Sequence, residues 1–449
     1  MLKYSLSFIL ALLTGLISAQ DMIQLKGVLL RSAGEHAAGD TITVVSQRMK
    51  FDGVTKQYGY ISYGNRKFID EDRIEILNPD MDFWEEVWFT NRADEITKVG
   101  WEKEKRQELY EDAMDYYSTA LKNNLIFEDE LLSDYLYQLT LAIHPFEMLK
   151  ERQRNFSILV LKSPEESSFA FDNGMIVLTT GLLATLQTEE QLIQLLAENI
   201  AHVVLEHNLI NFNRALKAER NARIWGTITA VAAATAMAVD EVNTGRWHDY
   251  GLAADLGASV YFLSRNTRSN IGAEYNNAQR IIAKQTAQKF LHTYPEVVNY
   301  DEVAFITQLA PAISVAAWTQ FHFKHYGTAY HMIQRLEDHG LTTDMDYFLM
   351  SRIIRKQYND LESNELALAY IEKGRAKSWE EFPELYKEEG LIYQRLGEFD
   401  KAIEAFSKYR QHLSSLRDKG HFVDSELRSI DQFIQRTSNL SKRVTEIQD

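Results

Sequence analysis

Hydrophobic and polar positions follow different periods in successive parts of the chain. Between residues 22 and 78, short apolar runs alternate with polar residues and are separated by turn residues, which predicts four or five strands. From Met81 to His144, apolar residues recur at i, i+3 and i+4, which predicts helices. The segments 155–162 and Met175–Thr179 have strand composition, and helical spacing continues from there almost to the end. This order predicts a multidomain α+β fold that is mainly helical.

The first 19 residues have the pattern of a secretory signal. Lys3 is followed by an apolar run, Phe8–Ile17, and by the small residues that precede a cleavage site at Ala19. The run is too short to span a bilayer. We therefore expect an exported protein whose mature chain starts near Gln20, located in the periplasm or cell envelope, or secreted.

Composition narrows the classes of function. The chain has 449 residues, a formal net charge of −16 and no cysteine. Such an acidic chain is a poor partner for nucleic acid, so we expect none. The lack of cysteine excludes disulfides, thiolate metal sites and cysteine nucleophiles. A second apolar stretch, 224–239, is shorter than the about 20 residues of a spanning helix. We expect it to form a packed helix, with contact to a membrane surface as the alternative.

Two parts of the chain resemble small modules. The strands of residues 20–80 resemble bacterial SH3-like domains, with a β-hairpin cap on the next domain as the alternative. The segment 383–416 resembles a tetratricopeptide repeat, and an ordinary helical hairpin is its alternative. A weaker helix pair is predicted upstream, at 347–355 and 366–374, because a single repeat cannot bury its own face. The resemblance to the repeat is carried by Gly390, Tyr393, Gly397, Ala402 and Phe406.

The strongest motif lies in residues 167–207. Its features, in order, are Phe169-Ala170, Gly174, a strand at 176–179, Gly181-Leu182-Leu183, Glu189-Glu190 and Ile200-Ala201-His202. They resemble metallopeptidase family forty-eight, the group of the HtpX, BepA and CAAX prenyl proteases. The resemblance implies a zincin-like α+β core, which we assign to residues 131–300. It also implies a helix with an HExxH zinc motif.

The local sequence agrees with such a helix. Thr188 and Gln191 have the spacing of a capping box, and an apolar stripe follows. The preceding strand is expected to be the edge strand of the sheet, along which a substrate chain would lie. The predicted substrate groove consists of Met175, Ile176, Val177, Leu178 and Thr179.

Replacements within the motif decide the expected chemistry. In HExxH two histidines hold zinc, and the glutamate between them activates water. Here Glu198 occupies the first ligand position, Asn199 occupies the general-base position, and His202 remains. The resemblance places the third ligand at Asn276, within 274–278. An amide has no useful basicity, and loss of acid–base catalysis alone costs a factor of about 10²–10⁴ in rate. We therefore expect an empty or weak metal site and no cofactor.

Other histidines are not expected to rebuild the site. His207 follows His202 by five positions, so we expect it to point away from the ligand face and to pack at the helix end. His322 and His325 have no acidic partner nearby in sequence, and we expect surface or core roles for them.

The sequence thus predicts an exported pseudopeptidase that binds or scaffolds proteins or peptides through its helical tail and its edge strand. One alternative is an active zinc-dependent metalloendopeptidase with non-standard ligands. The other is an adaptor that binds only through its SH3-like and repeat domains. The predicted organisation is a signal peptide at 1–19, a β-rich domain at 20–80, a helical connector at 81–130, the degenerate core at 131–300 and a helical tail at 301–449.

Overall fold

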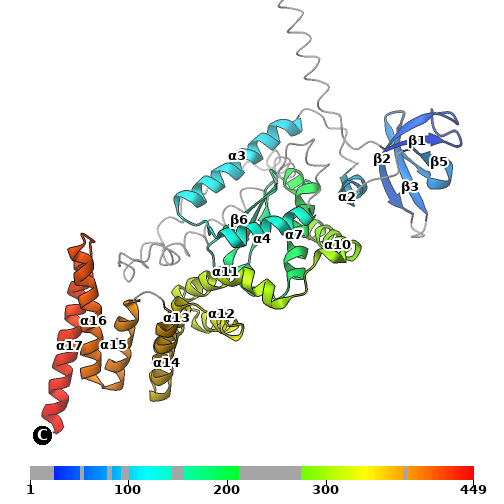
Figure 1. The fold of residues 1–449 in the computed structure, drawn as a ribbon. Coiled ribbons are helices and arrows are strands. Elements are labelled where there is room, and N and C mark those ends of the chain that lie inside the picture. Colours follow the sequence, from blue (N-terminus) through cyan, green and yellow to red (C-terminus); the bar gives the residue numbers. More distant parts are fainter. Residues whose placement is uncertain are drawn as a thin grey trace, which may run out of the picture.

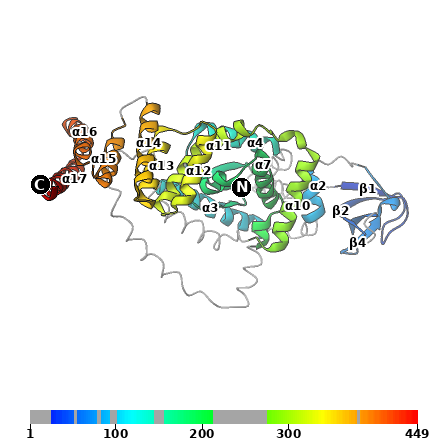
Figure 2. The same ribbon diagram turned by 90° about the horizontal axis from the view of Figure 1, so that it is seen from below.

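The computed structural model describes residues 25–50, 55–77, 83–92, 101–143, 156–211, 275–378 and 382–448. The predicted signal at 1–19 and the apolar stretch at 224–239 lie outside these residues. The described parts form three regions in a row, with a β-sheet at one end, an α+β core in the middle and a helical tail at the other end (Figures 1 and 2). Among the described helices, none combines the length and the apolar character needed to cross a membrane.

The N-terminal region is a five-stranded antiparallel sheet in the order β4-β3-β2-β1-β5. Alternate residues such as Leu25, Val44 and Tyr60 are buried, which explains the alternation in the sequence. The predicted β-rich region is therefore confirmed, while the SH3-like assignment stays a prediction. The strands are β1 (Leu25–Leu29), β2 (Thr41–Met49), β3 (Lys56–Ser62), β4 (Asn65–Asp70) and β5 (Ile74–Ile76).

Helix α2 (Phe83–Arg92) connects this sheet to the core. On one side, Gln47 Nε2 of β2 donates a hydrogen bond to Thr90 Oγ1 at 2.7 Å. On the other side, Trp84 Nε1 donates to the carbonyl of Ile143 at 2.7 Å, and the Trp84 ring stacks on Phe290. Buried hydrogen bonds and ring contacts thus join α2 to both regions.

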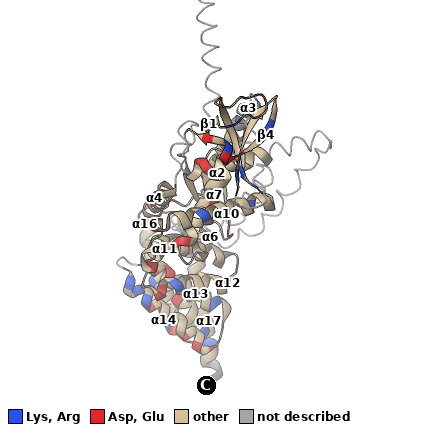
Figure 3. Cartoon of the chain, turned by 90° about the vertical axis from the view of Figure 1, so that its right-hand side faces the viewer, with Lys and Arg blue, Asp and Glu red and all other residues tan. Residues whose placement is uncertain are grey.

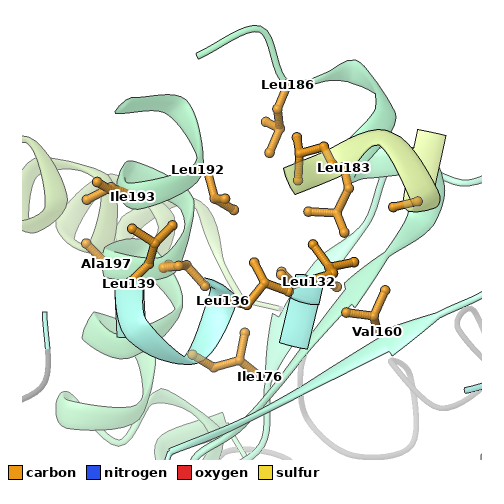
Figure 4. Close-up of a cluster of buried hydrophobic side chains, with 14 of the residues drawn as sticks. Leu132, Leu136, Leu139, Val160, Ile176, Leu183, Leu186, Leu192, Ile193 and Ala197 are labelled. Atoms are coloured by element: carbon orange, nitrogen blue, oxygen red, sulfur yellow. The ribbon is translucent and has the colours of Figure 1, made fainter. Parts of the chain in front are cut away.

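The core is built on a three-stranded sheet of β6 (Ser157–Leu161), β7 (Ser168–Ala170) and β8 (Met175–Thr179). One face packs against α3 (Trp101–Lys122), where Tyr116 contacts Phe169 and Phe171. The other face packs against α4 (Glu130–Ile143) and α7 (Glu189–Val204). Figure 4 shows Leu132, Leu136 and Leu139 of α4 together with Val160, Ile176 and residues of α7 in that layer.

The prediction that Met175–Thr179 is the edge strand is wrong. The strand order is β6-β8-β7, so β8 is central, parallel to β6 and antiparallel to β7. All five of its residues are buried because both faces of the sheet are covered. A substrate chain therefore has no free backbone groups to pair with on β8, and β7 forms that edge of the described sheet.

The C-terminal region consists of helix pairs and one further helix (Figure 1). The helix pair predicted at 347–355 and 366–374 falls within α13 (Asp344–Gln357) and α14 (Leu361–Lys377). The helix pair predicted at 383–416 corresponds to α15 (Glu384–Leu396) and α16 (Phe399–Asp418). A Cβ added at Gly390 would lie 2.5 Å from the Phe406 ring, so the expected close approach of α15 and α16 is present. Lys, Arg, Asp and Glu are intermixed on these helices (Figure 3), and the repeat assignment itself stays a prediction. The helices are α11 (Glu302–His322), α12 (Tyr326–Asp338), α13 (Asp344–Gln357), α14 (Leu361–Lys377), α15 (Glu384–Leu396), α16 (Phe399–Asp418) and α17 (Asp424–Gln448).

Candidate functional site

The motif helix α7 begins as the sequence predicts. Thr188 caps it, since its side-chain oxygen accepts a hydrogen bond from the Gln191 amide at 3.3 Å. The Gln191 side-chain oxygen accepts a hydrogen bond from the amide of Gln187, one residue before the expected donor, Thr188. Glu189 is buried, and its two carboxylate oxygens accept hydrogen bonds from Tyr135 and from the amide of Asn299. These contacts fix the start of α7 within the core.

A two-residue turn interrupts the helical backbone after α7. The helix ends at Val204, and Glu206 has a left-handed backbone with φ of 55°. This turn brings His207 back to His202, so that their Nδ1 atoms are 2.7 Å apart and both rings are buried. The prediction that His207 points away is therefore wrong, because it assumed that the helix continues through this position. Burial lowers the pKa of His202 to about 2, with smaller contributions from His207 and Arg280, and this keeps the ring neutral.

Tyr275 covers the other side of His202. The two rings are stacked, with centroids 3.4 Å apart and an angle of 16° between their planes. The Tyr275 hydroxyl donates to the carbonyl oxygen of Ala170, on β7, at 3.0 Å. Asn208 Nδ2 donates to the same carbonyl at 2.7 Å. His202 thus lies in a packed layer between α7, β7 and the segment that precedes α10 (Asn277–Thr293).

The other two motif positions on α7 have local partners. Asn199 is buried, and its Nδ2 donates to Ser168 Oγ at 3.2 Å and to the carbonyl of Leu195 at 2.9 Å. Glu198 is half-buried and accepts a hydrogen bond from Gln194 Nε2 at 2.9 Å. Both of these predicted motif positions are therefore engaged within the helix or with β7.

Asn276, the predicted third ligand, is the N-cap of α10. Its side-chain oxygen accepts a hydrogen bond from the Gln279 amide, and the Gln279 side chain accepts one from the Asn276 amide, both at 3.0 Å. This reciprocal capping box provides acceptors for backbone amides at the helix start that would otherwise have none within the helix. The Asn276 residue is exposed, whereas His202 is buried.

Comparison with known proteins agrees with this architecture. Residues 135–317 match the sequence model of peptidase family M48, which spans α4 to α11. Residues 135–317 are thus similar to an M48 peptidase domain. A Vibrio cholerae protein named as a beta-barrel assembly-enhancing protease is 26% identical over 157 residues. The aligned part is 35% of this chain and 30% of that protein, so the chain spans about a third of the relative's length. The family resemblance predicted from the sequence is confirmed.

The donor groups around the predicted metal site differ from those of a zinc centre. A catalytic zinc ion needs three protein ligands around one point and a base beside its bound water. Here the Asn276 oxygen caps a helix, Asn199 is an amide, and the buried His202 ring is stacked on Tyr275. Within the described residues, no three His, Asp or Glu side chains are grouped so that they could hold a metal ion. These contacts do not fit a catalytic zinc site, and the metal content of the M48 domain stays a prediction.

The two remaining candidate histidines lie at the end of α11. Burial and the nearby Arg352 guanidinium lower the pKa of His322 to about 4, and its ring lies beside those of Trp318 and Phe321. His325 is exposed, and its Nδ1 lies 2.8 Å from Gln320 Oε1. Gln320 in turn donates to the carbonyl of Pro164, which links α11 to the core.

Three residues around His202 were not predicted as part of the site. His207 and Tyr275 contact His202, and Asn208 bonds to the Ala170 carbonyl that Tyr275 also reaches. Their positions depend on the turn at Glu206 and on how α10 packs against α7, which no local pattern in the sequence indicates.

Proposed function

We propose that this chain is a non-hydrolytic M48 protein, an exported pseudopeptidase that binds or scaffolds proteins in the cell envelope. One observation carries the proposal: the general-base position holds Asn199, whose amide donates to Ser168 and to the Leu195 carbonyl. An amide cannot take a proton from water, so the step that makes the nucleophile lacks its base. The name of the Vibrio cholerae relative, which refers to beta-barrel assembly, supports an envelope location by analogy.

The helical tail is the part that we propose as the main partner-binding surface. Stacked helix pairs present long surfaces that suit extended or helical peptides. Charges of both signs lie on this surface (Figure 3), and pairs such as Arg375–Glu389 and Lys373–Glu337 link neighbouring helices. Such a surface favours polar, salt-sensitive contacts with proteins.

The deciding experiment measures zinc content and casein cleavage on the same purified full chain. We expect no stoichiometric zinc by elemental analysis and no cleavage. The control variant His325→Ala removes a histidine outside the motif and should leave both results unchanged. About one zinc per chain that is lost in His202→Ala, together with cleavage, would instead establish an active metalloendopeptidase with non-standard ligands.

A further inference from the structure

The outward-facing backbone groups of β7 can be identified from its pairing with β8. The Phe171 amide donates to the Met175 carbonyl at 2.8 Å, and the Thr179 amide donates to the Ser167 carbonyl at 3.2 Å. Residues next to these in an antiparallel strand direct their groups the opposite way. The amides and carbonyls of Ser168 and Ala170 therefore point to the outer edge, where an added peptide strand would pair.

That edge is already occupied by side chains of the same chain. The Ala170 carbonyl accepts hydrogen bonds from Asn208 Nδ2 at 2.7 Å and from the Tyr275 hydroxyl at 3.0 Å. A carbonyl oxygen has two lone pairs, and these two donors use both. An incoming strand must therefore displace at least one of them before its own amide can bond to Ala170.

The Tyr275 ring also closes the space between the strand edge and the motif histidine. It stacks face to face on His202 while its hydroxyl reaches β7. A peptide that paired with β7 and faced His202 would need the volume that this side chain fills. Its two contacts fix Tyr275 at both ends, which makes it a plug rather than a loose surface residue.

We propose that Tyr275 and Asn208 form an internal plug that holds the outer edge of β7 closed, and that removing the plug opens a strand-addition site for an extended peptide. This proposal adds a closed peptide-binding edge to the proposed function. It depends on that function only in assuming that a bound peptide is not cleaved. The chemical class of the ligand is an unfolded polypeptide, recognised through its backbone amides and carbonyls.

The test compares the affinity of full-length variants for fluorescein-labelled β-casein by fluorescence anisotropy. Tyr275→Phe loses one hydrogen bond and keeps the stacked ring, so we expect affinity to rise about fivefold. Tyr275→Ala also removes the ring, and its affinity should rise further. Tyr300→Ala, which removes a tyrosine that is 75% exposed before α11, is the matched control and should bind as the wild type does.

A second substitution tests whether the gain in casein affinity comes from pairing with β7. Ser168→Pro in the Tyr275→Ala background removes the outward amide of Ser168, and proline is tolerated on edge strands, so the gain should disappear. Ser168→Ala in the same background loses the same hydroxyl but keeps the amide, and should retain the gain. A gain that persists in the proline variant overturns the assignment to this edge.

The remaining outcomes are also decisive. Equal casein affinity of Tyr275→Ala and wild type, with unchanged thermal unfolding, overturns the plug. If Tyr275→Ala does not fold, equal affinity of Tyr275→Phe and wild type overturns it. Casein cleavage by Tyr275→Ala would refute the non-hydrolytic function, while a gain in binding would still support the plug.

Discussion

Asn276 separates a structural role from a metal-binding role, because both roles use the same side-chain oxygen. In the structure this oxygen accepts the Gln279 amide at the start of α10, and the Gln279 side chain returns the bond. A ligand role would require the oxygen to leave the cap and turn toward His202. Substitutions at this exposed position can therefore decide between the two.

The expected magnitudes follow from the capping box. Asn276→Ala removes the acceptor for the Gln279 amide, and loss of such an N-cap costs about 0.5–2 kcal/mol. Asn276→Asp keeps an acceptor and adds a negative charge at a helix N-terminus, which is favourable by about 0.3–1 kcal/mol. If Asn276 were a ligand, the same Asp substitution would also replace a neutral amide by a carboxylate that zinc prefers.

The assay is hydrogen exchange measured by mass spectrometry on peptides from α10, combined with elemental analysis. We expect the first-turn amides of α10 to exchange about fivefold faster in Asn276→Ala, which corresponds to about 1 kcal/mol of local stability. They should exchange at the wild-type rate or more slowly in Asn276→Asp, and zinc content should not change in either variant.

Two results would refute this reasoning. Unchanged exchange in Asn276→Ala would mean that the cap contributes nothing measurable to α10. Stoichiometric zinc in Asn276→Asp that is lost again when His202→Ala is added would mean that position 276 faces the motif histidine after all.

Three further predictions concern the tail. Gly390→Ala places a Cβ 2.5 Å from the Phe406 ring and should lower the stability of the α15–α16 pair by about 1–3 kcal/mol, as measured by hydrogen exchange. The control Gly327→Ala has open space around its new Cβ and should not lower the stability. Burial raises the pKa of Glu426 from 4.5 to about 7, so the folded tail binds this proton more tightly than the unfolded tail does. Its stability should therefore fall as pH rises from about 4.5 to 7, and Glu426→Gln should flatten this dependence in thermal melts. Deleting residues from Thr342 onward should abolish capture of native partners from a cell-envelope extract, whereas the full chain should still capture them. Capture of the same partners by the truncated chain would place the binding site in the core.

Periodicity predicted the elements of the fold but not their neighbours. The apolar stripe of α7 and the strand at Met175–Thr179 are present where the pattern indicates them. The same strand is an almost continuous apolar run, which is typical of a strand covered on both faces, although we expect it at the edge of the sheet from the sequence. Strand order depends on how the loops cross the sheet, and the pattern of apolar and polar residues does not predict those crossings.

The site shows a second limit of local reasoning. His207 lies five positions after His202, and a continued helix would point it elsewhere. The left-handed backbone of Glu206, a residue with no special preference for this conformation, interrupts the helix there, and the two rings come into contact. Replacements in the HExxH motif are visible in the sequence, whereas the partners that the replaced residues acquire depend on tertiary packing.

Those partners bear on whether the altered motif could be reversed. A buried polar group without a hydrogen bond costs about 1–3 kcal/mol, so a site that had only lost its metal would carry several such penalties. Here the buried Asn199 bonds to Ser168, and the buried His202 lies between His207 and Tyr275. Rebuilding HExxH by Glu198→His and Asn199→Glu would break the first contact and leave Tyr275 against His202. These contacts stabilise the arrangement around His202, and zinc binding by a rebuilt HExxH motif would have to overcome them.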